Sequence, residues 1–378
     1  MKIAELRTHV LEAPLEQPFG WSVDRTTVRK SCIVEIVTDT GLVGWGECFG
    51  PARPNAAVVN VFRDLLIGAD PIATDVIWQN LYNRFRDQGQ KGLVISGLSG
   101  VDIALWDIKG KAFGVPVHRL MGGPMRTRIQ AYATGTYRRD EGDVFEYILE
   151  EVRERLDEGF EGVKLKIGID FEEDIELIRA TRDLIGPGRQ LMLDANHAYD
   201  AIEAIQLGRR VADQNIAWFE EPVVPEDLAS YHEVKLGQPI PVAGGECDYT
   251  RWGFINIFTS RAMDIVQPDT GAAGGLSECK KIADMATAFG IRYIPHVWGS
   301  GISMAAALQL LASVPHTPAR LRPREPLLEM DRSEHPFRHA VITEPLVQHG
   351  GWVEVPTGPG LGIEVDRDAL RRFAAPDP

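Results

Sequence analysis

The 378-residue sequence is poor in cysteine and has no long apolar stretch. Its four cysteines are dispersed without a CxxC motif or a zinc-like cluster, which predicts reduced thiols. No run of about 18 uninterrupted apolar residues could span a membrane, and the charged N-terminus lacks the apolar core of a signal peptide. We therefore expect a cytoplasmic protein without a membrane partner.

Basic residues are also fewer than acidic residues. Asp and Glu total 54 against 40 for Lys and Arg, so the formal net charge is −14. Nucleic acids and anionic membranes bind basic surfaces, and we therefore expect no nucleic-acid partner. The sequence contains neither a Walker nor a GxGxxG loop, which argues against nucleotide chemistry. It also contains no HxH motif, which argues against a metal-dependent barrel hydrolase.

Residues 1–125 combine strand-like and helix-like patterns. Residues 2–13 and 31–47 are typical of strands, and Asp39-Thr40-Gly41 predicts a hairpin turn within the second stretch. Apolar residues recur at helical spacing over 99–114, and Gly114 predicts the end of that helix. We therefore predict an α+β domain in this part of the chain.

From residue 126 onward, short apolar runs alternate with charged segments of helical period. This alternation predicts a parallel sheet, and its length fits a (β/α)8-type TIM barrel over residues 126–331. A doubly wound sheet is the competing architecture. The predicted strands are 129–135, 162–168, 189–196, 216–222, 240–246, 263–269, 292–297 and 326–331.

Polar side chains end the strands of the predicted barrel, where the rim of a parallel barrel carries the active site. Asp194, Glu220 and Glu246 end consecutive strands, and three such carboxylates would repel one another strongly without a cation. Oxygen ligands in this number predict a Mg²⁺ site, whereas capping of the following helices is the alternative. Glu221 should face the helical layer. Asn196 shares the strand face of Asp194 and could contact either a ligand or the substrate.

Basic residues end other strands of the same barrel. Asp269 and His296 end neighbouring strands, and a carboxylate beside an imidazole fixes its tautomer and raises its basicity, which predicts an Asp–His dyad. Lys164 and Lys166 share one strand face. Lys164 should help to neutralise a substrate carboxylate and lower the pKa of Lys166, which would make Lys166 a base near neutral pH. Lysines extending into solvent and a rim histidine without a catalytic role are the alternatives.

Several motifs together resemble the mandelate racemase subgroup of the enolase superfamily. They are KLK at 164–166, LMLDANHAY, WFEEPV, VAGGE, DIVQPD and IPHVWGSG. Residues 99–123 are similar to a helix of that family's capping domain. The resemblance implies that residues 1–125 cap the barrel, that 332–378 return to the cap, and that the enzyme uses Mg²⁺ with a Lys or His base.

The resemblance also implies a chemistry and a set of roles. The carboxylate of an acid sugar binds Mg²⁺, a base removes the α-proton, and the metal stabilises the enolate. The implied ligands are Asp194, Glu220 and Glu246. The implied acid/base residues are Lys166 and His296, oriented by Asp269 and assisted by Lys164. Glu329 would hydrogen-bond the substrate carboxylate, although Asp331 shares its face. The implied substrate contacts are Asn196, Trp298 and, in a cap loop that could equally be solvated, Trp21, Asp24 and Arg25.

The family members closest in these motifs imply β-elimination that opens a galactaro-lactone, the reaction of a cycloisomerase. Dehydration of an acid sugar shares α-proton removal and β-departure, so a dehydratase is the alternative, and racemisation is a third outcome. A sugar-acid binding protein on the same scaffold would lack a ligand or a base, and none is missing. We expect a homo-oligomer acting on a small acid sugar.

Overall fold

The N-terminal part of the molecule is an antiparallel sheet followed by helices. The computed structural model describes residues 1–139, 142–318, 320–321 and 323–376. Three strands pair in the order β1 (Ile3–Gly20), β2 (Arg25–Thr38) and β3 (Val43–Cys48). The predicted hairpin is confirmed, because Gly41 lies in the turn between β2 and β3 with φ 84°. The helices are α1 (Ala52–Val61), α2 (Arg63–Leu66), α3 (Thr74–Phe85), α4 (Leu93–Phe113) and α5 (Val117–Leu120).

Helix α4 contains the stretch whose periodicity predicted a helix, and it starts six residues earlier than that stretch. Gly114 follows it with φ 67°, the left-handed conformation that glycine adopts readily at helix ends. The helix packs closely on β3: a Cβ atom at Gly46 would lie 2.0 Å from the carbonyl oxygen of Gly100. Two glycines therefore allow the sheet and α4 to meet backbone to backbone.

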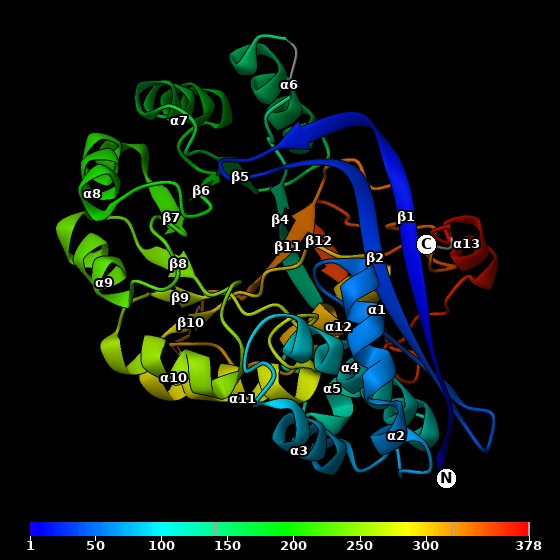
Figure 1. Ribbon diagram of the computed structural model, residues 1–378. Helices are drawn as coiled ribbons and strands as arrows, with labels where there is room; N and C mark the ends of the chain where they lie inside the picture. Colours follow the sequence, from blue (N-terminus) through cyan, green and yellow to red (C-terminus); the bar gives the residue numbers. More distant parts are fainter. Residues whose placement is uncertain (140–141, 319, 322, 377–378) are drawn as a thin grey trace.

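The following part of the chain forms a parallel sheet that curls into a barrel (Figure 1). All eight predicted strands are present and neighbours pair in parallel, which confirms the barrel and excludes a doubly wound order. The strands are β4 (Arg128–Thr134), β5 (Gly162–Lys166), β6 (Gln190–Asp194), β7 (Ile216–Glu220), β8 (Val242–Gly244), β9 (Ile265–Val266), β10 (Arg292–Tyr293) and β11 (Leu327–Asp331). The helices are α6 (Val144–Asp157), α7 (Phe171–Ile185), α8 (Ala201–Arg210), η1 (Ala212–Gln214), α9 (Leu228–Gly237), α10 (Thr250–Ser260), α11 (Gly275–Phe289) and α12 (Gly301–Leu311).

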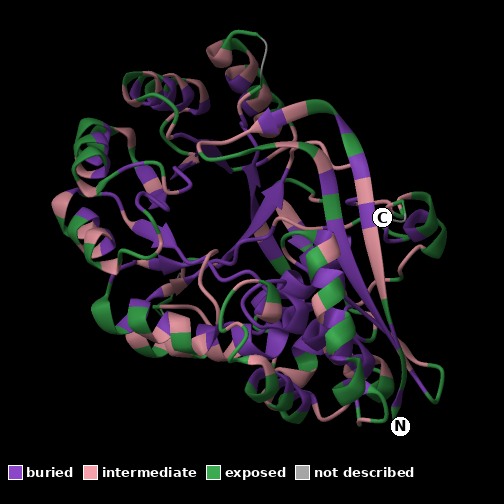
Figure 2. Ribbon diagram, in the orientation of Figure 1, coloured by how far each residue is buried: buried purple, intermediate pink, exposed green. Residues whose placement is uncertain are grey.

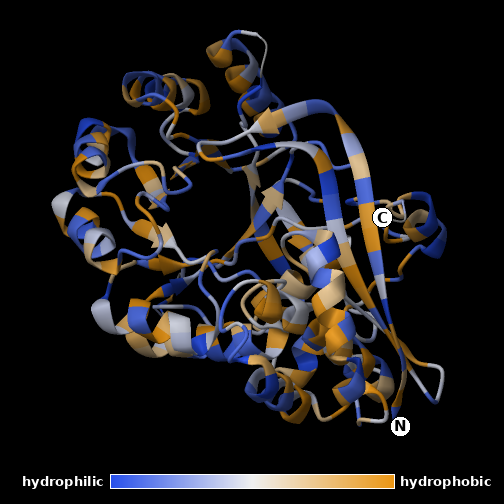
Figure 3. Ribbon diagram, viewed as in Figure 1, coloured by the Kyte–Doolittle hydropathy of each residue, from blue (hydrophilic) through white to orange (hydrophobic). Residues whose placement is uncertain are grey.

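The strands of the barrel are buried on both faces, as is typical of parallel sheets covered by helices (Figure 2). Apolar residues concentrate on the strands and on the helix faces turned toward them (Figure 3). A separate apolar cluster fills the middle of the barrel: Tyr132, Met192, Trp218, Ala243, Ile265, Ile294 and Leu327. None of the described helices is long and apolar enough for a membrane span.

The C-terminal segment contacts first the barrel and then the cap. Strand β12 (Trp352–Glu354) pairs antiparallel with β4. Farther on, the amide of Glu12 donates to the carbonyl of Phe373, and α13 (Arg367–Arg372) lies beside β1 (Figure 1). The Arg367 guanidinium is 2.5 Å from the carboxylate of buried Glu35. Residues 367–375 therefore lie against β1 and β2.

Candidate active site at the carboxyl end of the barrel

Two buried lysines are held by carboxylates at the end of β5. Lys164 Nζ lies 2.5 Å from Glu220 Oε1, 2.7 Å from Glu329 Oε1 and 3.3 Å from Asp194 Oδ2. Lys166 Nζ lies 2.6 Å from Asp194 Oδ2 and donates to Asn196 Oδ1 at 2.8 Å. The strands align Lys166 with Asp194 and Asp194 with Glu220, so the side chains meet at one level of the barrel.

The pKa of Lys166 is shifted opposite to the prediction. Burial alone would lower it, and so does Lys164, but Asp194 and Tyr137 outweigh both and raise the pKa above its ordinary value. Burial likewise opposes the charge on Lys164, whose pKa is raised mainly by Glu220 and Glu329. The prediction considered the repulsion between the two lysines and left out the neighbouring carboxylates, which raise the pKa of both.

The three predicted metal ligands lie at this end of the barrel but not as a closed group. Glu220 is occupied: its Oε1 contacts Lys164, and its Oε2 accepts from Trp218 Nε1 at 2.9 Å and from Gln267 Nε2 at 2.7 Å. Burial, opposed by Lys164, raises the pKa of Glu220 to about 7. Glu246 Oε2 lies 3.5 Å from His296 Nε2. A cation bound to Asp194, Glu220 and Glu246 together would have to draw these side chains toward one another.

Glu221 does not face the helical layer, so this expectation was wrong. Its backbone turns at φ 42°, and its fully buried carboxylate lies 3.2 Å from His197 Nε2. Neither carboxylate oxygen has a hydrogen-bond partner among the described residues. Burial, followed by the charges of Glu246 and Asp194, raises the pKa of Glu221 well above its usual range. A buried acid with no donor, surrounded by other acids, is an environment that favours a cation.

His197, Glu221 and Cys247 form the one compact set of possible metal ligands in the described parts of the chain. One ligand atom from each lies within 4.8 Å of the others. Cys247 Sγ is 3.8 Å from His197 Nε2. The dispersed cysteines gave no sign of this set, because its members are distant in sequence and come from the segments that follow β6, β7 and β8.

The structure brings Asp269 and His296 together. His296 Nδ1 is 2.7 Å from Asp269 Oδ2, and the other carboxylate oxygen accepts from the amide of Gly271 at 2.6 Å. Burial would lower the pKa of His296, but Glu246 and Asp269 raise it to about 10. The bond at Nδ1 leaves Nε2 directed toward Glu246, in the acid-rich part of the site.

Glu329 and Asp331, which share a face of β11, have different partners. Glu329 Oε1 contacts Lys164, and its Oε2 accepts from the amide of Val297 at 3.0 Å. That bond links β11 to the segment after β10, and no backbone pairing joins these two strands among the described residues. Asp331 instead pairs with Arg29 at 2.9 Å and Arg338 at 2.5 Å. Only Glu329 therefore contacts the two-lysine cluster.

Aromatic side chains from the cap and the barrel meet beside Lys166. Trp21 lies edge-on to Trp298, with ring centroids 6.1 Å apart, and to Tyr137 at 6.2 Å. Lys166 Nζ is 5.4 Å from the centre of the Tyr137 ring. Arg29 covers the Trp298 ring at 4.1 Å. Of these rings, Tyr137 contacts Lys166, and the predicted contacts Trp21 and Trp298 follow it in a chain of ring contacts.

The other two predicted cap contacts, Asp24 and Arg25, are exposed. Sequence reasoning did not single out Tyr137, Arg29 or Gln267 for the site. Tyr137 follows β4, so extending the strand-end rule to the first barrel strand would have found it.

Comparison with known proteins places the chain in a family. Residues 4–122 match the mandelate racemase / muconate lactonizing enzyme N-terminal domain, and residues 147–369 match the enolase C-terminal domain-like family. The chain belongs to the mandelate racemase / muconate lactonizing enzyme family of the enolase superfamily, which confirms the resemblance drawn from the motifs.

Individual relatives cover nearly the whole chain. It is 53% identical over 378 residues, all of both chains, to D-galactarolactone cycloisomerase of Agrobacterium fabrum. It is 36% identical to arabinonate dehydratase of Saccharolobus solfataricus, over 89% of this chain and 88% of that one. Among solved structures, the 3,6-anhydro-D-galactonate cycloisomerase of Zobellia galactanivorans superposes with a TM-score of 0.90 at 38% identity, over all of both chains.

Proposed function

We propose that this protein is a Mg²⁺-assisted cycloisomerase that removes the proton α to a carboxylate of a galactaro-lactone and opens the lactone by β-elimination. The observation that carries the proposal is the 53% identity over the full chain to a D-galactarolactone cycloisomerase. The arrangement of Lys166, His296 and the surrounding acids supports it, because α-proton removal needs a base, a counter-charge and a site for the substrate carboxylate.

The donor set at the carboxyl end suits a hard cation. Five carboxylates, those of Asp194, Glu220, Glu221, Glu246 and Glu329, lie around two lysines and one histidine, and the oxygens of Glu221 have no donor among the described residues. We assign Asp194, Glu220 and Glu246 as the Mg²⁺ ligands. Bound Mg²⁺ would supply Lewis-acid stabilisation of the negative charge that develops at the substrate carboxylate.

Lys166 and His296 are the proposed acid/base pair. The residue that removes the α-proton is the one on whose side the bound stereoisomer presents its hydrogen, and the other is placed to deliver a proton. Lys166 is now paired with Asp194. Giving up that pairing would remove the largest charge that raises the pKa of Lys166. Burial and Lys164, which lower the pKa toward that of a useful base, would then be opposed only by Tyr137 and Glu246 among the main contributors. Asp269 holds His296 through Nδ1 and so leaves Nε2 for the substrate.

Lys164 is the proposed contact to the substrate carboxylate, and Glu329 positions it. Burial would raise the pKa of Glu329, but Lys164 and His296 lower it below its usual range, so the carboxylate is charged. A charged Glu329 cannot donate to a substrate carboxylate as the resemblance implied. Through Oε1 it can hold the Lys164 ammonium in place.

Recognition of the sugar is assigned to the aromatic contacts. Trp21, Tyr137 and Trp298 would enclose the apolar face of the ring beside Lys166. Asn196, through its bond to Lys166, would contact the substrate near the reacting carbon. Contacts from Asp24 and Arg25 to a distal carboxylate remain predictions, as does assembly into a homo-oligomer.

The proposal is tested by incubating the protein with Mg²⁺ and a panel of aldarolactones, aldarates and aldonates in D₂O, with products identified by NMR. We expect opening of a galactaro-lactone to a 3-deoxy-2-keto acid, with deuterium incorporated from solvent. Lys166→Ala and His296→Asn, each checked for an unchanged melting temperature, show which residue moves the proton. Absence of both exchange and turnover across the panel would contradict the enolisation chemistry.

Dehydration of an acid sugar is the second candidate function. The 36% identity to an arabinonate dehydratase favours it, and the same α-proton removal followed by loss of a β-hydroxyl would require no different residues. The same panel distinguishes the two. Turnover of an open-chain aldonate or aldarate with loss of water, and none of a lactone, would assign the dehydratase reaction.

A further inference from the structure

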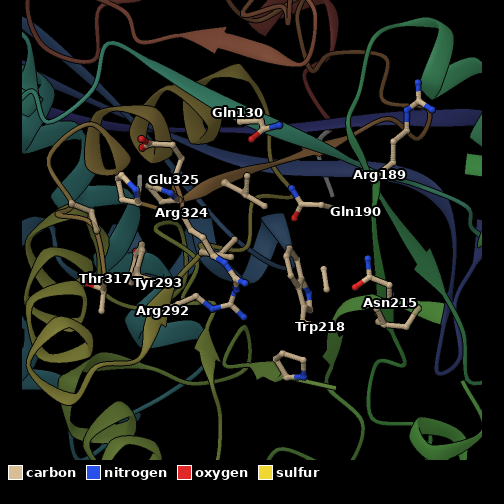
Figure 4. Close-up of a pocket in the computed structure, with 18 of the residues that line it drawn as sticks. Gln130, Arg189, Gln190, Asn215, Trp218, Arg292, Tyr293, Thr317, Arg324 and Glu325 are labelled. Carbon is tan, nitrogen blue, oxygen red and sulfur yellow. The ribbon is translucent and has the colours of Figure 1, made fainter. Parts of the chain in front are cut away.

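A cavity of about 530 Å³ opens at the end of the barrel opposite to the candidate active site (Figure 4). Its lining includes Gln190, Ile216, Arg292 and Leu327, which are the first residues of β6, β7, β10 and β11. The proposed catalytic groups, in contrast, come from the carboxyl-terminal parts of the strands or from the segments that follow them. The apolar cluster around Trp218 lies between the two ends.

Arginines line the cavity, and they have no anionic partner among the described residues. Arg292 and Arg324 both extend into it (Figure 4), and neither side chain has a hydrogen bond or an ion pair with another described residue. Arg189 lines the same cavity, and among described residues its side chain contacts only the carbonyl of Ile185, at 3.2 Å. Burial is the main cause that lowers the pKa of Arg292 to about 10; the charge of Arg324 lowers it further, and Asp264 opposes the shift.

The nearby carboxylates are already occupied. Glu325 lines the cavity, but its Oε2 lies 2.9 Å from Arg126 Nε and 2.7 Å from His316 Nε2. Asp264, the acid whose charge acts on Arg292, pairs with Lys235 at 3.0 Å and accepts from the amide of Val242. The arginines therefore keep an excess of positive charge facing an open volume.

We infer that this cavity binds a small multivalent anion with carboxylate or phosphate oxygens. Guanidinium groups donate to such oxygens two at a time, and an anion placed between two guanidiniums would also remove their mutual repulsion. The side-chain amides of Gln130, Gln190 and Asn215 also line the cavity and offer both donors and acceptors to hydroxyl groups of an acid-sugar ligand. The site does not depend on the proposed catalytic reaction.

The anion site is tested by calorimetric titration without Mg²⁺, using inorganic phosphate in one arm and galactarate in the other at matched ionic strength with chloride. The test variant is Arg292→Gln with Arg324→Gln. The matched control is Arg86→Gln, which removes an exposed arginine outside the cavity. We expect the wild type and Arg86→Gln to bind equally and the double variant to bind at least tenfold more weakly.

The two arms identify the source of the anion. If the double variant loses affinity for phosphate alone, the cavity is a phosphate site. If it loses affinity for galactarate alone, the cavity is an acid-sugar site. Arg324→Gln alone, in an exposed position, keeps the fold and should weaken binding severalfold. The inference is overturned if neither anion binds, if the double variant binds as the wild type does, or if Arg86→Gln loses as much affinity. It is also overturned if Glu246→Ala abolishes galactarate binding while the arginine variants leave it unchanged.

Discussion

At the carboxyl end of the barrel, five carboxylates gather around two lysines and a histidine, and one of them, Glu221, has no donor among the described residues. At the amino end, Arg292 and Arg324 extend into a cavity whose lining carboxylate, Glu325, is already paired with Arg126. The two ends belong to the same sheet and are separated by apolar side chains of the barrel interior. The carboxyl end thus has an excess of negative charge and the amino end an excess of positive charge. A folded protein tolerates such an excess where a ligand of opposite charge binds.

The largest effect is expected from His296→Asn, which removes an acid/base group from the carboxyl end. We expect turnover to fall by about 10²- to 10⁴-fold, the usual contribution of such a residue, with the melting temperature nearly unchanged. His349→Asn, at an exposed histidine, is the matched control and should keep full activity. Turnover of His296→Asn at the wild-type rate would remove the dyad from the mechanism.

Asp331→Asn should reduce stability rather than chemistry, because it leaves Arg29 and Arg338 buried without their shared carboxylate. We expect a loss of about 3–5 kcal/mol in the free energy of unfolding at pH 7, measured by denaturant titration. Asp284→Asn, at an exposed ion pair, should cost less than about 1 kcal/mol.

The loss in the free energy of unfolding caused by Asp331→Asn should also depend on pH. Burial opposes the charge, but Arg338 and Arg29 lower the pKa of Asp331 below its ordinary value near 4. The carboxylate therefore stabilises the fold above pH 4, and that contribution falls away as the pH drops toward the lowered pKa. The difference between wild type and variant should narrow below pH 4. A constant difference between pH 7 and pH 3 would contradict the ion-pair explanation.

Glu246→Ala tests whether the carboxylates at the carboxyl end of the barrel bind a metal ion. We expect Mg²⁺ affinity to fall by about tenfold or more, since even supporting residues of metal sites contribute that much. The Mg²⁺-induced rise in melting temperature should shrink accordingly. Glu233→Ala, at an exposed acid on α9, should bind Mg²⁺ as the wild type does. Equal affinity in both variants would leave the carboxyl end without an assigned cation.

The smallest effect is expected at the amino end and has the opposite sign. Arg324→Gln removes a charge that repels Arg292, so in the absence of multivalent anions it should raise stability slightly, by less than about 1 kcal/mol. The gain should disappear in high salt, where charge interactions are screened. A loss of stability at low salt would show that Arg324 has a stabilising partner and would weaken the contrast between the two ends.

Strand positions and rim residues were predictable because both follow from local periodicity. The eight apolar runs became the eight barrel strands, and their last polar residues reached one end because parallel strands share a direction. The adjacency of Asp269 and His296 followed from the same rule.

The failures concern backbone turns and long-range charge. Glu221 was placed by strand alternation, but its chain leaves the strand at φ 42°, so parity no longer applies. The pKa shift of Lys166 depends on Asp194, at the end of β6, and on Tyr137, in the segment after β4, and no count along the sequence predicts its sign. The arginine cavity combines residues from 130 to 327, and its charge imbalance becomes visible only when the partners of Glu325 and Asp264 are known.

The loop that carries Trp21 is fastened to the barrel by a short polar link, in which Ser22 Oγ donates to the carbonyl of Ala195 at 2.7 Å. Ala195 directly follows the strand that ends in Asp194, so the loop is anchored to main chain and not to Lys166 or His296. The proposed contact of Trp21 with the sugar predicts that exchanging residues 16–27 with those of a relative changes which substrate is accepted. Phe19 and Trp21 pack on Tyr137, which contacts Lys166, so Tyr137 is the residue through which such an exchange would reach the proposed base.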